Sequence, residues 1–303
     1  MEQNIPVPDF TPVMVIAGLL ALAPYIGAAF FAGRGEGCAR RWPVSAQVLL
    51  PGLLCVPYLM IALTVGSFRW QWLAVYVFVP MGVAALMVVR NRMPGRSWGD
   101  GIEFLILAVL GLAVDLRWFE GAWPAHLAAF NKVLLVDAGI YGFVALRQLE
   151  GVGFDLRLRG RDVGIGLREF VFYLPVALAL GLEMGFLHRH GFGEGVGAVA
   201  LRFAGAWVFT FFLIAVPEEL FFRGWLQNLL ERHIGRWAAL GTASILFGLA
   251  HFNKRAVQFN WQYVLMAAIA GLFYGRAWRQ DRRVVASAVT HATVDAVWSL
   301  WLR

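Results

Sequence analysis

The stretch Val216-Pro217-Glu218-Glu219-Leu220-Phe221-Phe222-Arg223 places two adjacent carboxylates and a guanidinium inside a long apolar run. Charged side chains are costly in apolar surroundings and are usually kept there for a function. If the chain carries out a chemical reaction, we expect the reaction to take place at this stretch.

The composition around this stretch is that of a membrane protein. Of the 303 residues, 60% are hydrophobic and 15% are charged, and apolar windows long enough to cross a membrane recur along the chain. Crossing the hydrocarbon core takes about 20 residues of helix. The short alternating segments of a transmembrane β-barrel are missing from the sequence. We therefore predict an all-α, polytopic membrane protein with about ten transmembrane helices.

The predicted spans cover 10–32, 44–66, 71–89, 101–116, 127–146, 163–187, 197–230, 237–252, 261–277 and 284–302. The fourth span is short and carries Glu103, and the seventh is too long for one simple crossing. A polar, Gly- and Arg-rich linker at 148–162 separates an N-terminal region of five spans, 1–147, from a C-terminal core of five spans, 163–303. Nearly all candidate chemistry lies in the C-terminal core.

The net charge of +7 is carried almost entirely by arginine. In a soluble protein such a charge would suggest nucleic acid, but here the basic residues fall between spans and favour the odd-numbered loops. We therefore expect no nucleic-acid partner, a lipid bilayer as surroundings, and cytoplasmic odd-numbered loops. These loops carry Arg34, Arg40, Arg41, Arg90, Arg92, Arg96, Arg147, Arg157, Arg159, Arg161, Arg232, Arg236, Arg276, Arg279, Arg282 and Arg283, whereas the even-numbered loops carry Arg69, Arg117, Arg189, Lys254 and Arg255.

Helical spacing assigns different neighbours to the two glutamates. Glu219 and Arg223 are four residues apart and share a helix face, so they can form an ion pair, whereas Glu218 lies about 140° away from Arg223. Glu219 and Arg223 are thus candidates for structural support, and Glu218 is left for another role. The alternative is that both glutamates are structural and that Arg223 anchors the helix at the membrane interface.

A histidine closes the next span, in the motif Phe247-Gly248-Leu249-Ala250-His251. If the two helices form a hairpin that turns near Gly235, Glu218 lies 17 residues before the turn (235 − 218) and His251 lies 16 after it (251 − 235). Both then reach a similar depth, roughly 20–25 Å from the turn. The carboxylate and the imidazole can face each other, although a lone histidine at a span end can also be a simple interfacial residue.

The last span carries His291 and Asp295, which are four residues apart and project from one helix face. They complete a set of ionisable groups from three helices. Glu218 can take a proton from water with His251 assisting, and His291 can stabilise negative charge on a carbonyl oxygen. The same set, Glu218, His251, His291 and Asp295, can also hold a divalent metal such as zinc. A purely structural Asp–His pair is the remaining alternative.

Three short motifs occur in a fixed order near the end of the chain: Glu218-Glu219-xxx-Arg223, Phe247-xxx-His251 and His291-xxx-Asp295. Together they resemble the CPBP (Abi, type II CAAX-protease-like) family of intramembrane endopeptidases, over about 205–300 and more loosely from Asp162. This resemblance implies hydrolysis of a peptide bond in a membrane-associated or lipidated polypeptide, within the bacterial cytoplasmic membrane. It also implies that Glu218 and His251 activate water. Because family members are described as metal-dependent and as metal-independent, either no cofactor or one divalent metal is expected.

Residue 295 departs from the family pattern. The CAAX-processing members carry asparagine at this position, where the resemblance implies an oxyanion site shared with His291. An ionised aspartate cannot donate a hydrogen bond to an oxyanion. Asp295 is therefore expected to be protonated, to orient His291, or to ligate a metal.

Two other function classes fit the same residues. A proton-coupled transporter would use buried Glu and His side chains as an ion relay, although the chain shows no internal repeat of the kind from which many transporters are built. A non-enzymatic membrane scaffold or immunity protein would use them only for packing.

Overall fold

The computed structural model describes residues 11–30, 38–93, 97–124, 127, 129–188, 195–254 and 258–302. Every regular element in this described part is a helix, so the all-α prediction is confirmed. Contacts divide the chain into two compact units, Met1–Gln148 and Leu149–Arg303. The basic loop residues Arg34, Arg96, Arg189 and Arg255 lie outside the described residues.

The described residues of the first unit form ten helical elements, of which η2 and η5 are 3₁₀ or π-helical segments that continue or precede an α-helix without a break. They are α1 (Pro12–Phe30), η1 (Ala39–Arg41), α2 (Val44–Leu49), η2 (Leu50–Cys55), α3 (Val56–Thr64), α4 (Trp70–Arg92), α5 (Ser97–Asp115), η3 (Glu120–Ala122), α6 (Ala129–Gly139) and η5 (Ile140–Leu146).

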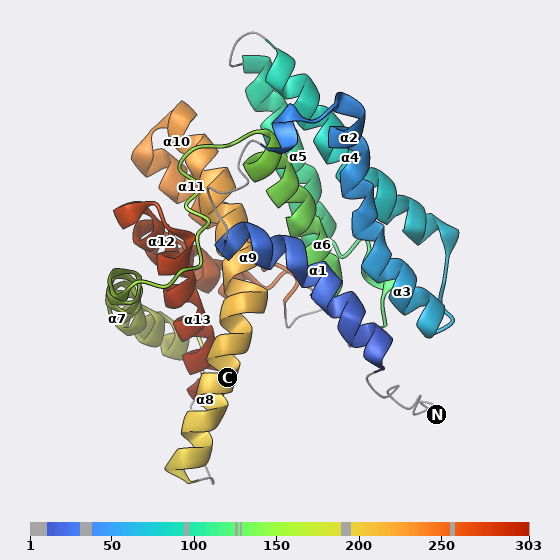
Figure 1. Cartoon of the computed structure of the whole chain (residues 1–303). Helices are drawn as coiled ribbons and strands as arrows, with labels where there is room; N and C mark the ends of the chain where they lie inside the picture. The colour runs from blue at the N-terminus through green and yellow to red at the C-terminus, as the bar shows by residue number, and fades with distance from the viewer. Residues whose placement is uncertain are drawn as a thin grey trace. The chain divides into compact units, whose positions relative to one another are not determined.

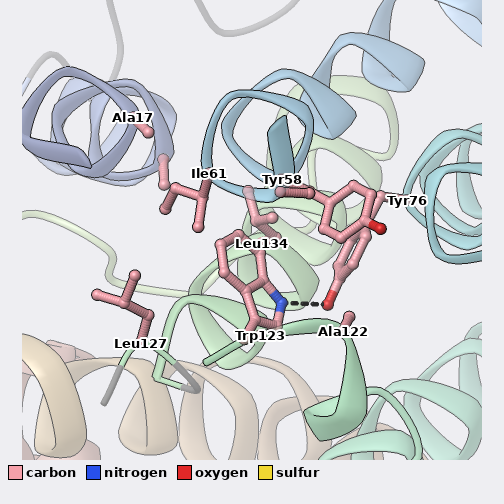
Figure 2. Close-up of a cluster of buried hydrophobic side chains, with 10 residues drawn as sticks. Ala17, Tyr58, Ile61, Tyr76, Ala122, Trp123, Leu127 and Leu134 are labelled. Atoms are coloured by element: carbon pink, nitrogen blue, oxygen red, sulfur yellow. Dashed lines mark hydrogen bonds between the residues drawn. The ribbon is translucent and has the colours of Figure 1, made fainter. Parts of the chain in front are cut away.

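An aromatic cluster holds α3, α4 and the segment before α6 together. The rings of Tyr58 and Tyr76 stack with their centres 5.3 Å apart. The indole nitrogen of Trp123 donates a hydrogen bond of 2.6 Å to the Tyr76 hydroxyl, which is the dashed line in Figure 2. The Tyr76 hydroxyl in turn donates to Asn131 at 2.9 Å. Buried tyrosine and tryptophan side chains are thus paired through their polar atoms, as burial in an apolar environment requires.

Glu103 lies buried at one end of this unit. Its carboxylate is paired with Arg90 at 2.6 Å and with Arg147, at the ends of α4 and η5. A fully buried carboxylate is stable only with such partners. The arrangement accounts for a charged residue in the short fourth predicted span, and it gives Glu103 a structural role.

The second unit contains α7 (Gly160–Glu183), α8 (Val196–Thr210), η6 (Phe211–Ala215), α9 (Val216–Glu219), η7 (Leu220–Gln227), α10 (Asn228–Ile234), α11 (Arg236–Leu249), α12 (Trp261–Asp281) and α13 (Val284–Trp301). The elements from α8 to α10 follow one another along a single helical rod (Figure 1). Helix α13 packs against α7, α8, α9 and α12 and is buried along most of its length. This central helix carries two of the predicted site residues.

Each of the ten predicted spans coincides with a helix or with a run of consecutive helical elements. Six of these stretches are long and apolar enough to cross a membrane: Pro12–Phe30, Val44–Thr64, Trp70–Arg92, Ala129–Leu146, Gly160–Glu183 and Val196–Ile234. Within the residues that the structure describes, helices α5, α11, α12 and α13 are not among these stretches. The last stretch of the six is 39 residues long, as the excess length of the seventh predicted span required.

The predicted linker is an ordered strap that ties three helices of the second unit together. The carbonyl oxygen of Glu150 accepts from the Asn228 side chain at 2.8 Å, and that of Val152 accepts from the Trp278 indole at 3.1 Å. Gly153, with a φ of +71°, places its carbonyl oxygen 3.0 Å from the first N–H of α13. Glycine adopts this left-handed conformation without the strain that a side chain adds. We refer to residues 149–157 as the strap.

Ion pairs between arginine and aspartate side chains hold the end of the strap. Arg283, directly before α13, pairs with Asp155 at 3.1 Å and with Asp162 at 2.8 Å, and Arg157 pairs with Asp155 at 2.8 Å. Burial alone would raise the pKa of Asp155, but the hydrogen bonds from Arg157 and Arg283 outweigh it and hold this pKa well below its usual range. The junction between α12 and α13 is therefore fixed by ionised groups.

Candidate active site

The two glutamates lie on α9, a single α-helical turn between two π-helical segments, η6 and η7. Pro217 lies in this turn and has no N–H, so the helical hydrogen bond that residue 217 would donate is missing. Wider π turns inside a long helix often accompany functional sites, because they change the direction in which side chains point. Glu218 and Glu219 thus lie on a locally irregular part of a long helix.

Glu219 is fully buried and has two partners. Its Oε2 lies 3.0 Å from Nε of Arg223, which is the ion pair that the four-residue spacing predicts. Its Oε1 lies 2.9 Å from Nδ1 of His291 on α13, a contact that the spacing does not predict. The Arg223 guanidinium, also fully buried, lies 5.0 Å from the centre of the Phe247 ring. Glu219 therefore joins the internal ion pair to the candidate site.

His291 lies at the centre of the site, with carboxylates near both of its ring nitrogens. While its Nδ1 faces Glu219, its Nε2 lies 3.5 Å from Oδ2 of Asp295 and 3.9 Å from Oε2 of Glu218. The ring of Tyr274 stacks on the imidazole at 4.6 Å and fixes its plane. The His291 side chain is 4% exposed, whereas Glu218 and Asp295 are 16% and 30% exposed. The two carboxylates thus lie on the more open side of the histidine.

His251 lies in the turn just after α11, on the second arm of a hairpin. The chain turns at Gly235, with a φ of +77°, between α10 and α11, where the sequence predicts the turn. Nδ1 of His251 lies 2.8 Å from the carbonyl oxygen of Phe247. Because a carbonyl oxygen only accepts, this nitrogen carries the hydrogen and Nε2 has the free lone pair. The carboxylate of Glu218 lies within electrostatic range of the His251 imidazole.

Aromatic rings hold both imidazoles in place. Phe247 contacts His251 and His291, with ring centres 4.8 Å and 5.7 Å apart, and Tyr263 stacks on His251 at 5.2 Å. Tyr263 and Tyr274 are not recognisable as site residues in the sequence, because uncharged rings do not stand out in a chain rich in aromatic residues. Their only signal is that each lies on the helix between the two histidine motifs.

A further buried carboxylate, Glu169 on α7, was also missed. Its oxygens pair with Arg168 at 2.9 Å and with Arg276 at 3.2 Å. Glu183, at the end of the same helix, is exposed. The structure thus brings together the four site residues that the sequence predicts and adds Glu219 to them.

The donor groups do not have the arrangement of a metal site. Within the described ranges, no group of three or more His, Cys, Asp or Glu side chains is placed to hold a metal ion. Nδ1 of His251 and Nδ1 of His291 each face an oxygen atom, so Nε2 is the nitrogen of each imidazole that remains for a water, a substrate or a metal. The reaction proposed for this site uses only the side chains of this chain.

Comparison with known proteins locates the resemblance in the same part of the chain. Residues 200–297 match the family described as type II CAAX prenyl endopeptidase Rce1-like. The uncharacterized protein YpbD of Bacillus subtilis (strain 168) is 30% identical over 96 residues, which are 32% of this chain. The chain spans 45% of the length of that relative. No solved structure matches the chain. The family resemblance expected from the three motifs is therefore confirmed over residues 200–297, which are similar to the Rce1-like type II CAAX prenyl endopeptidases.

Proposed function

We propose that this protein is an intramembrane endopeptidase that hydrolyses a peptide bond in a membrane-associated or lipidated, CAAX-like polypeptide. The observation that carries this proposal is the set of carboxylates around one imidazole: Glu219 at 2.9 Å, Asp295 at 3.5 Å and Glu218 at 3.9 Å from His291. The match of residues 200–297 to a peptidase family supports the same reaction class.

Glu218 acts as the general base in this proposal. Its carboxylate takes a proton from a water molecule, and the free Nε2 of His251 accepts a hydrogen bond from the same water and orients it. The 2.8 Å contact of His251 with the Phe247 carbonyl oxygen supports this role, because it fixes the tautomer that leaves Nε2 as an acceptor.

His291 stabilises the oxyanion that forms when water adds to the peptide carbonyl carbon. Nδ1 of His291 donates to Glu219, and a proton on Nε2 donates to the oxyanion. Two carboxylates, Glu219 and Asp295, then balance the positive imidazolium. Asp295 acts by orienting and charge-balancing His291 at 3.5 Å, which is one of the roles left open for an aspartate at this position.

Protons balance over the reaction. Water adds its oxygen to the carbonyl carbon and gives one proton to Glu218, which forms the tetrahedral intermediate. When the carbon–nitrogen bond breaks, Glu218 returns this proton to the leaving amine. The products are a carboxylic acid and an amine, and every side chain is restored.

The membrane arrangement is part of the proposal. All ten predicted spans cross the bilayer, with the odd-numbered loops in the cytoplasm and the protein in the bacterial cytoplasmic membrane. The C-terminal core of five spans, 163–303, carries the reaction, and water reaches it from the cytoplasmic side. Helices α11, α12 and α13 cross despite their polar residues because they pack against one another and against α7.

The test is cleavage by the purified full-length protein in liposomes. The substrates are a fluorogenic peptide with a prenylated CAAX cysteine and the same peptide without the lipid. Glu218→Gln and His251→Gln are expected to lower kcat by about 100-fold or more without shifting the unfolding midpoint. Glu183→Gln is the matched control, since it makes the same chemical change at an exposed position of the same unit and should leave kcat unchanged.

Cleavage by Glu218→Gln at the wild-type rate would overturn the proposal. If the wild type cleaves neither peptide and liposomes show Glu218-dependent substrate counterflow, the protein is a transporter instead. If Glu218→Gln is silent in every functional readout, the motif residues serve only packing.

A further inference from the structure

A cluster of arginine and tryptophan side chains lies at the turn between α10 and α11 and beside the end of α12. It consists of Arg236, Trp237, Arg279 and Arg282, and we call it the Arg–Trp surface. The ion pairs and cation–π contacts of these residues lie within the cluster and with Glu231 and Trp278, and none of the residues is used in the proposed reaction.

An exposed indole lies between two cations in this cluster. The Trp237 ring is 72% exposed, and its centre lies 4.9 Å from the Arg279 guanidinium carbon and 5.6 Å from that of Arg236. Arg282 lies 4.5 Å from the centre of the Trp278 ring next to it. Aromatic faces attract cations and hold long arginine side chains in one position. The guanidinium groups are therefore arranged by the fold and are not free surface chains.

The positive charge of the cluster is only partly balanced. Both Arg279, at 3.0 Å, and Arg282, at 2.5 Å, pair with the single carboxylate of Glu231. Three arginines against one glutamate leave a local charge of +2 (3 − 1). The Arg279 side chain is 3% exposed, yet its Nη2 has no hydrogen-bond partner among the described residues. Arg236 and Arg282 are both close enough to repel Arg279.

The backbone adds to the attraction for an anion. Helix α11 is 14 residues long and begins at Arg236, so its first N–H groups lie at the end of the helix that carries Arg236 and Trp237. The first turn of a helix has N–H groups without helical partners and carries the positive end of the helix dipole. The exposed guanidinium groups of Arg236 and Arg282, the first N–H groups of α11 and the local excess of positive charge together form a site for a phosphate group.

The apolar surroundings identify the source of the phosphate as a lipid. Ile234 is 46% exposed and Trp237 is 72% exposed, beside the arginines at the end of a helical hairpin. Tryptophan is enriched at the level of lipid headgroups, and basic pockets between helix ends bind anionic headgroups. We propose that the Arg–Trp surface binds the phosphate headgroup of an anionic phospholipid, with Trp237 and Ile234 against the upper part of the acyl chains.

The test measures lipid retention by the full-length protein. Protein purified in a neutral detergent is mixed with phosphatidylglycerol, with phosphatidylcholine or with inorganic phosphate. Retained lipid is counted by native mass spectrometry, and the unfolding temperature is measured in parallel. Phosphatidylglycerol is expected to be retained in preference to phosphatidylcholine and to raise the unfolding temperature more. Removing one arginine should weaken phosphatidylglycerol binding by about fivefold.

Two variants and one control make the test specific. Arg236→Gln removes an exposed charge whose contact is with the Trp237 ring, so the variant should fold normally and still lose binding. Trp237→Leu tests the indole while keeping an apolar side chain. Arg168→Gln is the control, because it removes the same charge from a side chain that is 45% exposed on α7. This control should bind phosphatidylglycerol as the wild type does.

Three results would overturn the inference. The first is equal retention of the two phospholipids. The second is phosphatidylglycerol binding that Arg236→Gln leaves unchanged or that Arg168→Gln weakens equally. The third is stabilisation by inorganic phosphate that equals that by phosphatidylglycerol, which would show a free anion site. None of these results depends on peptide cleavage, so the inference fails or stands apart from the proposed enzyme activity.

Discussion

Replacing Glu219 with glutamine should strongly destabilise the protein, because Glu219 neutralises a charge that has no access to water. Glu219 and Arg223 are both fully buried and lie 3.0 Å apart. The Arg223 guanidinium lies over the Phe247 ring, and its Nη1 and Nη2 have no hydrogen-bond partner in the described part of the chain. Glu219→Gln would leave this guanidinium without its carboxylate.

The expected loss follows from burial. Removing one partner of a buried ion pair costs about 3–5 kcal/mol, whereas an exposed pair contributes about 0.2–1 kcal/mol. The exposed pair of Arg161 and Asp281, joined at 2.7 Å with side chains 74% and 24% exposed, provides the control. Asp281→Asn should therefore lower the free energy of unfolding by less than about 1 kcal/mol.

The measurement is reversible unfolding in mixed micelles, followed by tryptophan fluorescence as the denaturing detergent increases. A double-mutant cycle adds Arg223→Met and the combined variant. Because the double variant removes both buried charges, it should lose less stability than the sum of the single losses, by more than about 1 kcal/mol. If Glu219→Gln costs no more than Asp281→Asn, or if the two losses simply add, the assignment of Glu219 and Arg223 as an internal brace is wrong.

Three further predictions concern the site and the strap. Asp295→Ala should lower kcat for peptide cleavage by about 100-fold, because His291 loses the carboxylate that orients it, while Asp295→Asn should retain more activity. A Cβ on Gly153 would lie 1.7 Å from a backbone oxygen, so Gly153→Ala should lower the unfolding free energy by at least about 1–3 kcal/mol; Gly164→Ala, with nothing within 4 Å, should not. The depressed pKa of Asp155 contributes stability above the unfolded-state pKa of about 4, and this contribution is lost as the pH falls. The stability difference between wild type and Asp155→Asn should therefore be constant above about pH 5 and shrink below it, and a difference that stays constant down to pH 3 would contradict the ionised strap.

Patterns within one element were readable from the sequence. Apolar stretches of the right length predicted the helices, four-residue spacing predicted the Glu219–Arg223 pair, and the glycine at 235 marked the hairpin turn. These features depend on local geometry, which the order of residue types determines directly. The prediction that the three motifs lie close together combined such local features with the similar distances of Glu218 and His251 from the hairpin turn.

Contacts between distant segments were not readable in the same way. The bond from His291 to Glu219 joins residues 72 positions apart, and it depends on how α13 packs against α9. The π-helical segments on both sides of the glutamates change the rise per residue, which a straight-helix estimate omits. Glu169 was missed because its arginine partners are a sequence neighbour and a residue on α12.

The strap also sets where the C-terminal half can be separated from the rest of the chain. The hydrophobic spans of this half begin at 163, but contacts group residues 149–162 with it, 14 residues earlier (163 − 149). A fragment that starts at 163 would lack the carbonyl oxygens that accept from Asn228, Trp278 and the first N–H of α13. A fragment that starts at 149 keeps all three. Protease cleavage or an insertion within the strap would therefore loosen the N-terminal end of α13, the helix that carries His291. This end lies about two helical turns from His291.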